Sequence, residues 1–166
     1  MTTTSFSLSS RGDLVRGRVA GHQPGEARPL VIVCGPEGAA AGEQVDACLA
    51  AWSRWAIVAS IDLPLCGARR SEKLSKLAFD PASKLSARLA GDIRRQVASD
   101  LEAARAWLTA HTPVDRERVA LAGFGLGSRL VRSYCERSRD LATHVLADSE
   151  PPPTVESRLR ERLTTP

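Results

Sequence analysis

The chain has 166 residues, 43% of them hydrophobic and 25% charged, which are the proportions of one soluble globular domain. Its 23 basic residues exceed its 19 acidic residues by only four, and the arginines are spread among acids, which argues against a nucleic-acid partner. The four cysteines form no Cys-x-x-Cys pair and no cluster with histidine, so we predict no metal site and no cofactor.

We expect no targeting segment in this chain. The first residues lack the basic segment and apolar stretch of a signal peptide, and no later apolar run is long enough to span a bilayer. We therefore predict a cytoplasmic protein with free thiols and no membrane partner. One domain is expected over residues 1–150, followed by a proline-rich turn and a short helix in residues 151–166.

The first predicted elements are a hairpin, a buried strand and a helix. Polar and apolar residues alternate on both sides of Arg11-Gly12-Asp13, a tight-turn signature, which predicts an antiparallel hairpin. The apolar run at 29–34, stopped by Gly35-Pro36, is typical of a strand buried on both faces. A helix is predicted at about 42–54.

Further strands alternate with long helices. The strands are predicted at 56–61, 118–122 and 144–147, and the helices at about 86–111 and 127–138. In the longest helix apolar residues recur near a period of 3.6, and it ends before Pro113. This alternation predicts an α/β fold with a mostly parallel sheet of about six strands and helices on both faces.

The turn Gly123-Phe124-Gly125-Leu126-Gly127, between a strand and a helix, carries most of the functional information. A strand-turn-helix written G-x-S-x-G is a nucleophile elbow, which holds its central serine exposed above the sheet. Here the frame is intact, and the central residue is glycine.

Three segments in order make the chain resemble the α/β-hydrolase superfamily, in particular its small esterases and dienelactone-hydrolase-like members. The strand and loop at 30–38 stand where the family has an apolar strand followed by His-Gly. Residues 62–71 are similar to the family's D-x-P-x-H-G-x-x-x-S loop, and residues 114–127 to its aspartate-and-arginine turn, strand and elbow. The resemblance covers residues 29–150 and implies a truncated α/β-hydrolase sheet.

Departures from the family pattern predict a catalytically degenerate member. Gly125 has no side chain that could attack a substrate. In the simplest register Pro36, which has no N–H, stands where the oxyanion loop would donate one, and a shift by one residue places Gly35 there. The resemblance also implies that the later strands with the acid and base are absent, since none of the histidines lies where the family's base lies. These histidines are His22, His111 and His144.

Two routes to a non-standard nucleophile stay open. Cys34 or Cys66 could act as a thiolate near the elbow, and Ser128 lies one helical turn after Gly125. Buried cysteines usually behave as small apolar residues, and a serine in a first helical turn is usually structural. We therefore interpret this region as a vestigial pocket for a small apolar ligand. Its residues are Cys34, Gly35, Pro36, Cys66, Phe124, Gly125 and Leu126.

A dinucleotide-binding turn is a further alternative. Gly123-x-Gly125-x-x-Ser128 follows a strand and opens a helix, and Asp148 ends the next strand, near the place of a ribose-binding acid. This fingerprint normally lies on the first strand of its sheet, and it does not explain the loops at 34–38 and 62–71. We therefore favour a non-catalytic, hydrolase-like binding or assembly module over a dinucleotide-binding protein and over an esterase completed by a partner.

The C-terminal segment predicts self-association. After the strand at 144–147 come only Pro151-Pro152-Pro153 and a tail, so one edge of the sheet is open. Residues 154–163 predict a helix capped by Thr154, with one apolar stripe. The stripe, which contains Val155, Leu159 and Leu163, either covers the chain's own sheet or packs against a second copy. We expect a homodimer or a protein partner at the open edge.

Overall fold

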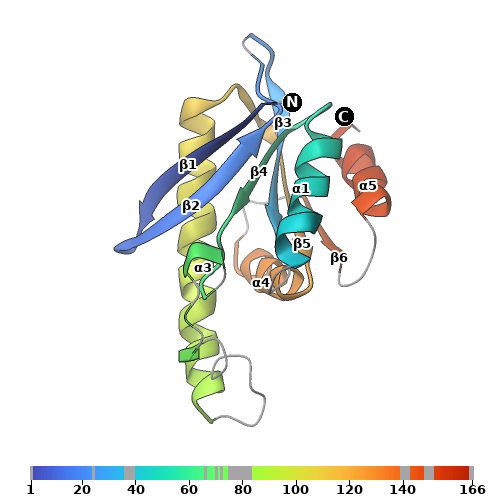
Figure 1. Cartoon of the computed structure of the whole chain (residues 1–166). Coiled ribbons are helices and arrows are strands. Elements are labelled where there is room, and N and C mark those ends of the chain that lie inside the picture. The colour runs from blue at the N-terminus through green and yellow to red at the C-terminus, as the bar shows by residue number, and fades with distance from the viewer. Residues whose placement is uncertain are drawn as a thin grey trace.

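The structure is a computed structural model, and it describes residues 2–23, 25–35, 40–65, 67–69, 71, 73–74, 84–138, 143–147 and 152–164. Its strands are β1 (Thr3–Ser10), β2 (Asp13–Ala20), β3 (Arg28–Cys34), β4 (Ile57–Ile61), β5 (Val114–Phe124) and β6 (Thr143–Ala147). These six form one sheet in the order β1-β2-β4-β3-β5-β6 (Figure 1). The predicted sheet of about six strands is confirmed.

Strands β1 and β2 form the predicted antiparallel hairpin, which is paired from Thr3 and Ala20 to Ser10 and Asp13. Strand β2 also pairs antiparallel with β4, whereas β4, β3, β5 and β6 pair parallel to one another. Parallel neighbours require long crossover connections, which the helices supply. The sheet is therefore an antiparallel pair that leads into four parallel strands.

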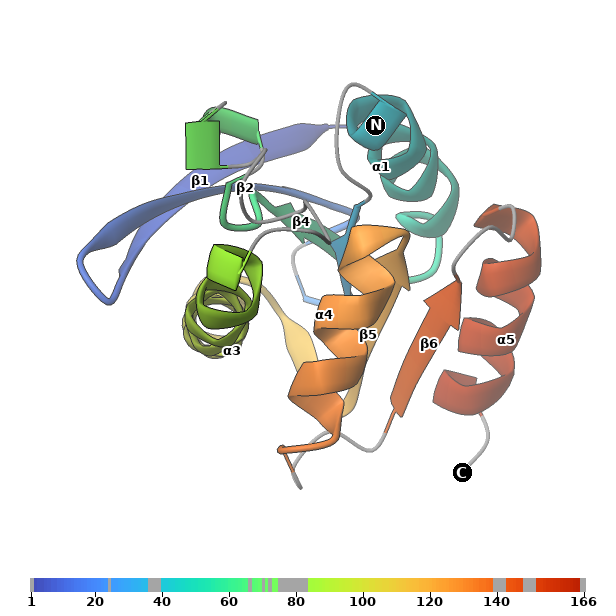
Figure 2. The same cartoon turned by 90° about the horizontal axis from the view of Figure 1, so that it is seen from below.

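The α-helices of the described part are α1 (Ala40–Trp52), α3 (Lys84–His111), α4 (Leu126–Cys135) and α5 (Pro152–Thr164), and a short 3-10 helix, η1 (Gly67–Arg69), follows β4. Helices α3 and α4 cover one face of the sheet, and α1 and α5 cover the other (Figure 2). None of the helices in the described ranges is long and apolar enough to cross a membrane. The predicted α/β class with helices on both faces is confirmed.

Strand β3 lies in the middle of two apolar cores. Leu30 and Ile32 pack into the core under α3 and α4, and Val31 and Val33 pack into the core under α1 and α5. All four side chains are 0% exposed. Successive side chains of a strand point to opposite faces, so a strand covered on both faces needs the continuous apolar run seen in the sequence.

Strand β5 is longer than the predicted 118–122. Its first residue, Val114, pairs with Arg28, and the register shifts between Arg28 and Leu30. Polar residues occupy 115–118, and Arg118 Nε donates to Asp115 Oδ2 at 2.6 Å. Residues 115–118 lie within this register shift, and apolar periodicity could not detect this half of the strand because it has no apolar pattern.

Helix α5 begins at Pro152, so the prediction that Thr154 caps it is wrong. Proline suits a first helical turn, because its φ is already helical and the N–H that it lacks would have no partner there. Thr154 lies inside the first turn instead of before it.

The apolar stripe of α5 packs on the chain's own sheet. Val155, Leu159 and Leu163 are 0%, 0% and 3% exposed, in the same core as α1 and β5. Trp55 Nε1 donates to Glu156 Oε1 at 3.0 Å, and Arg160 Nη2 lies 2.8 Å from the same oxygen. The preference for a dimer through this stripe is therefore wrong, because the stripe is covered within the chain.

Candidate functional site

The predicted elbow is a sharp turn between β5 and α4. Gly125 joins the last residue of β5 to the first residue of α4 with φ 52° and ψ −119°. Residues with a side chain rarely adopt a positive φ with such a ψ, because this backbone conformation is strained for them. Glycine has no side chain and adopts it more easily. The backbone N–H of Ser128 donates to the Gly125 carbonyl at 3.1 Å and closes the first turn of α4.

The outer glycines of the elbow are required by close backbone contacts. A Cβ on Gly127 would lie 2.1 Å from the Cys34 carbonyl oxygen and 2.8 Å from that of Gly35. A Cβ on Gly123 would lie 2.6 Å from Ser128 Cα. The first turn of α4 thus packs directly on the end of β3, and the G-x-G-x-G frame follows from this packing.

Ser128 has a structural role. Its side chain is 0% exposed, and Oγ donates to the Gly125 carbonyl at 2.9 Å. A nucleophile must reach the substrate and transfer its proton to a base. The structure therefore argues against Ser128 as a replacement nucleophile.

The thiol of Cys34 is neutral. It is 0% exposed at the end of β3, and burial, together with the nearby Cys135 and Asp100, raises its pKa to about 12. The thiolate is the reactive form of cysteine, so Cys34 is unreactive at neutral pH. Burial also raises the pKa values of Cys48, to about 12, and of Cys135.

The candidate pocket residues do not all face one space. Cys34 and Leu126 are buried in the core under α3 and α4, whereas Phe124 is buried under α1 and α5, with its ring centroid 6.3 Å from that of Trp52. Gly35 is buried beside Gly127. Three of the predicted residues, Pro36, Cys66 and Asp148, lie outside the described residues.

Two of the three histidines, His22 and His111, lie away from the elbow. His111 ends α3, stacks on Trp107 with ring centroids 4.3 Å apart, and precedes β5, whereas Gly125 follows β5. The length of that strand places His111 on the order of 30 Å from the elbow. His22 is exposed after β2. His144 lies in β6, where it pairs with Leu121 of β5.

An ion-pair network supports the loop after β4, and sequence reasoning missed it. Arg69 Nη1 donates to Asp100 Oδ2 at 2.5 Å and to the Asp62 carbonyl at 3.1 Å, and Nη2 donates to Asp13 Oδ2 at 2.8 Å. Asp100 is 0% exposed and also accepts a hydrogen bond from Gln96 at 2.8 Å.

This network ties three elements together. Although burial lowers the pKa of Arg69, its hydrogen bonds to Asp100 and Asp13 outweigh that effect and raise it, so the guanidinium stays charged. It joins the hairpin, the loop that begins at Asp62, and α3. The signal in the sequence is an acid, Asp100, placed among the apolar positions of α3 between Val97 and Leu101.

Comparison with known proteins places this geometry in a fold family. No family model and no curated protein matches the sequence. A solved structure of a cold-adapted esterase from an Arctic intertidal metagenomic library is similar, with 18% identity, a TM-score of 0.62, and coverage of 99% of this chain and 69% of that one. A putative dienelactone hydrolase from Klebsiella pneumoniae has 16% identity, a TM-score of 0.61, and coverage of 98% and 81%. The chain has the α/β-hydrolase fold.

A third structure, the α/β hydrolase GrgF from Penicillium sp., has 16% identity and a TM-score of 0.59, and the match covers 88% of this chain but 45% of that one. The predicted resemblance to esterases and dienelactone hydrolases is thus confirmed for the fold. The glycine turn follows β5, between β3 and β6, rather than the first strand of a nucleotide-binding half, which weakens the dinucleotide alternative.

Proposed function

We propose that this α/β-hydrolase-like chain is a non-catalytic binding or assembly module. The observation that carries the proposal is Gly125, which occupies the apex of a folded elbow with φ 52° and has no nucleophilic atom. Catalysis by acyl transfer requires a side-chain nucleophile at that place. A fold keeps its scaffold when its site loses its chemistry, and function then depends on what other surfaces bind.

The groups nearest to the elbow do not replace the nucleophile. Ser128 donates its hydroxyl proton to the backbone, and the Cys34 thiol has a pKa of about 12. A partner chain that supplied an acid and a base would still leave Gly125 without a group to activate. These points favour a binding role over an esterase completed by a partner.

Ester hydrolysis is the reaction against which to test the proposal, because the similar structures include an esterase and a dienelactone hydrolase. We expect no turnover of p-nitrophenyl acetate or butyrate above buffer, and no labelling by a fluorophosphonate or a thiol-directed probe. Turnover that Cys66→Ala or Ser128→Ala abolishes would overturn the proposal and establish a non-standard nucleophile.

The dinucleotide alternative has its own test. We expect calorimetry to detect no binding of NAD or NADP, because a second mononucleotide-binding half is required to hold a dinucleotide. Micromolar affinity that is lost in Asp148→Ala would instead favour that alternative.

The assembly part of the proposal concerns β6. Among the described strands, β6 pairs only with β5, so its other edge has no partner strand there. An open edge favours pairing with another chain, and we infer a second copy or another protein at this edge. Light scattering over a concentration series tests this, because a monomer at tens of micromolar contradicts a homodimer.

The cellular compartment follows from the same reasoning. Cys34, Cys48 and Cys135 are free cysteines in the described part of the chain. Free thiols are typical of reducing compartments, and we propose that the protein acts in the cytoplasm. Fractionation of cells that express a tagged chain tests this.

A further inference from the structure

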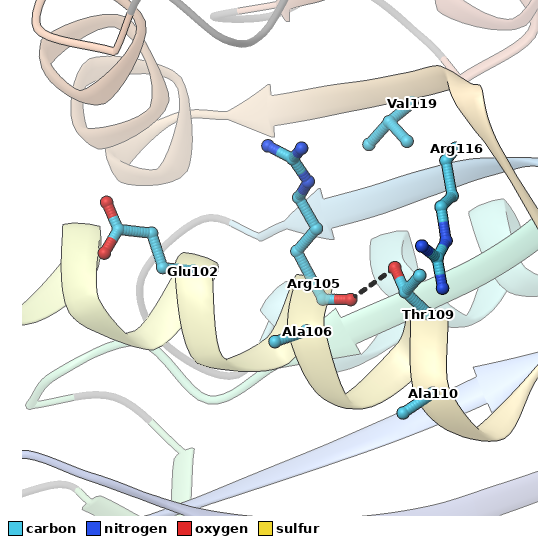
Figure 3. A pocket seen from close by; sticks show the side chains of 7 residues that line it. All are labelled: Glu102, Arg105, Ala106, Thr109, Ala110, Arg116 and Val119. Carbon is cyan, nitrogen blue, oxygen red and sulfur yellow. Dashed lines mark hydrogen bonds between the residues drawn. The ribbon is translucent and has the colours of Figure 1, made fainter.

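A groove lies between α3 and the first half of β5, far along the strand from the elbow. Its cavity volume is about 450 Å³. Figure 3 shows the lining side chains, which are Glu102, Arg105, Ala106, Thr109 and Ala110 from α3 and Arg116 and Val119 from β5. This volume lies within the range of small-molecule sites.

Two guanidinium groups enter the groove from opposite sides. Arg105 extends from α3 and Arg116 from β5 into the space between the two elements (Figure 3). Neither guanidinium has an ion pair or a hydrogen bond with any residue that the structure describes, whereas the nearby Arg118 is bonded to Asp115. Arg105 is also partly buried, and a partly buried charge without an ion pair is unfavourable.

The other polar groups of the groove do not compete for an anion. Thr109 Oγ1 donates its proton to the Arg105 carbonyl at 2.8 Å, so this hydroxyl has no proton left for a ligand (Figure 3). Glu102 lies on α3 seven residues before Thr109, about 10 Å along the helix axis. Glu102 is also three residues before Arg105, so the two side chains are neighbours on the surface of α3. The strong donors of the groove are therefore the two guanidinium groups, and its one acid lies on the side of Arg105.

We propose that this groove binds a small organic phosphate monoester, with the phosphate held by Arg105 and Arg116. Arginine is charged at all accessible pH values and presents a planar fork of donors that matches phosphate oxygens. A phosphate monoester carries a charge of about −1.5 to −2 at neutral pH and three acceptor oxygens, so it can bond two guanidinium groups at once, whereas a monocarboxylate has two oxygens and a single charge. The small apolar side chains of Ala106, Ala110 and Val119 would contact the organic part.

This site goes beyond the proposed binding role by naming its place and ligand class. It lies on side chains that the elbow does not use. An absence of phosphate binding would not change the expectation for ester hydrolysis. Ester turnover would likewise not change the expectation for the groove. The two proposals therefore fail separately.

The test is a calorimetric titration of phenyl phosphate into the full chain at low ionic strength. We expect saturable binding of one molecule and at least a tenfold loss of affinity in Arg105→Gln and in Arg116→Gln. Arg88→Gln is the matched control, because Arg88 is exposed on the same helix, about 25 Å from Arg105 along the axis, and its loss changes the net charge equally. We expect this control to bind as the unmodified chain does.

Several outcomes would overturn the proposal. They are an absence of saturation at millimolar phenyl phosphate, an equal loss of affinity in Arg88→Gln, and equal affinity for benzoate. Arg116 is exposed, so Arg116→Gln should keep the thermal unfolding midpoint and stay informative even where Arg105→Gln is less stable. Glu102→Gln should strengthen binding two- to fivefold, because it removes a like charge from the groove, and weaker binding in this variant would contradict the placement.

Discussion

The two ends of β5 are built in opposite ways. At its carboxyl end the elbow consists of backbone packed on backbone, so closely that a Cβ on Gly127 would lie 2.1 Å from the Cys34 carbonyl oxygen. Toward its amino end long side chains, Arg105 and Arg116, line a groove of about 450 Å³. The outer glycines of the elbow have no room for a side chain, whereas side chains line the groove.

The backbone of a site can keep its shape when the reactive side chain is absent. The elbow keeps its shape without a nucleophile because backbone contacts, and not the side chain at position 125, hold it. The groove can gain or lose a ligand by changes of single side chains, because its floor and wall are regular elements. In this chain the elbow and the two arginines of the groove lie at different ends of β5.

The largest expected effect comes from breaking the buried ion pair that supports the loop near the elbow. Asp100→Ala should lower the free energy of unfolding by about 3–5 kcal/mol, because it leaves the Arg69 guanidinium buried without its closest counter-charge. Urea denaturation measures this. Asp92→Ala is the control, since the exposed pair of Asp92 with Arg95 should contribute only about 0–1 kcal/mol. Similar losses of stability in both variants would show that the Arg69 network does not stabilise the fold.

A smaller loss is expected from adding one methyl group at the elbow. Gly127→Ala should lower the free energy of unfolding by about 3 kcal/mol, because its Cβ meets backbone that cannot move away. Gly42→Ala in α1 is the matched control. Its Cβ meets nothing within 4 Å, so it should stabilise the protein by up to about 1 kcal/mol. A tolerated Gly127→Ala in thermal unfolding would contradict the backbone packing described for the elbow.

Restoring a hydroxyl at the apex tests whether the elbow is complete apart from its nucleophile. Gly125→Ser should cost about 1–3 kcal/mol of stability for its positive φ, and should not hydrolyse p-nitrophenyl acetate, because no described histidine lies beside it. Gly12→Ser, at φ 85° in the hairpin turn with nothing within 4 Å, controls for strain alone. Enzymatic turnover by Gly125→Ser would reveal a base near the elbow.

The smallest expected effect is on the alkaline side of the pH–stability curve. The pKa of Cys34 is raised to about 12 in the folded chain, so above pH 9 the unfolded chain loses this proton first and stability falls as pH rises. The fall due to Cys34 should be about 1 kcal/mol between pH 9 and pH 10. Urea denaturation of the unmodified chain and of Cys34→Ala at both pH values measures it. If the free energy of unfolding falls equally in the two chains between pH 9 and pH 10, the Cys34 thiol is accessible and the prediction is wrong.

Local patterns in the sequence were enough to predict the sheet and the elbow. The apolar run of β3, the 3.6-residue period of α3 and the glycine frame at 123–127 each report on neighbours in the chain, which is why their positions agree with the structure. The predicted strand boundaries were less accurate where the apolar pattern stops, as in the polar first half of β5.

Contacts between distant residues decided the rest. The sequence of α5 predicts an apolar stripe but not its partner, and only the packed fold places Leu159 against the core of α1. The state of Cys34 depends on burial, and the network of Arg69 joins residues 31 and 56 positions away in the chain. The sequence by itself determined which elements form and that the elbow lacks a nucleophile. Only tertiary structure decided which side chains are buried and which are paired, because these depend on neighbours that no local pattern records.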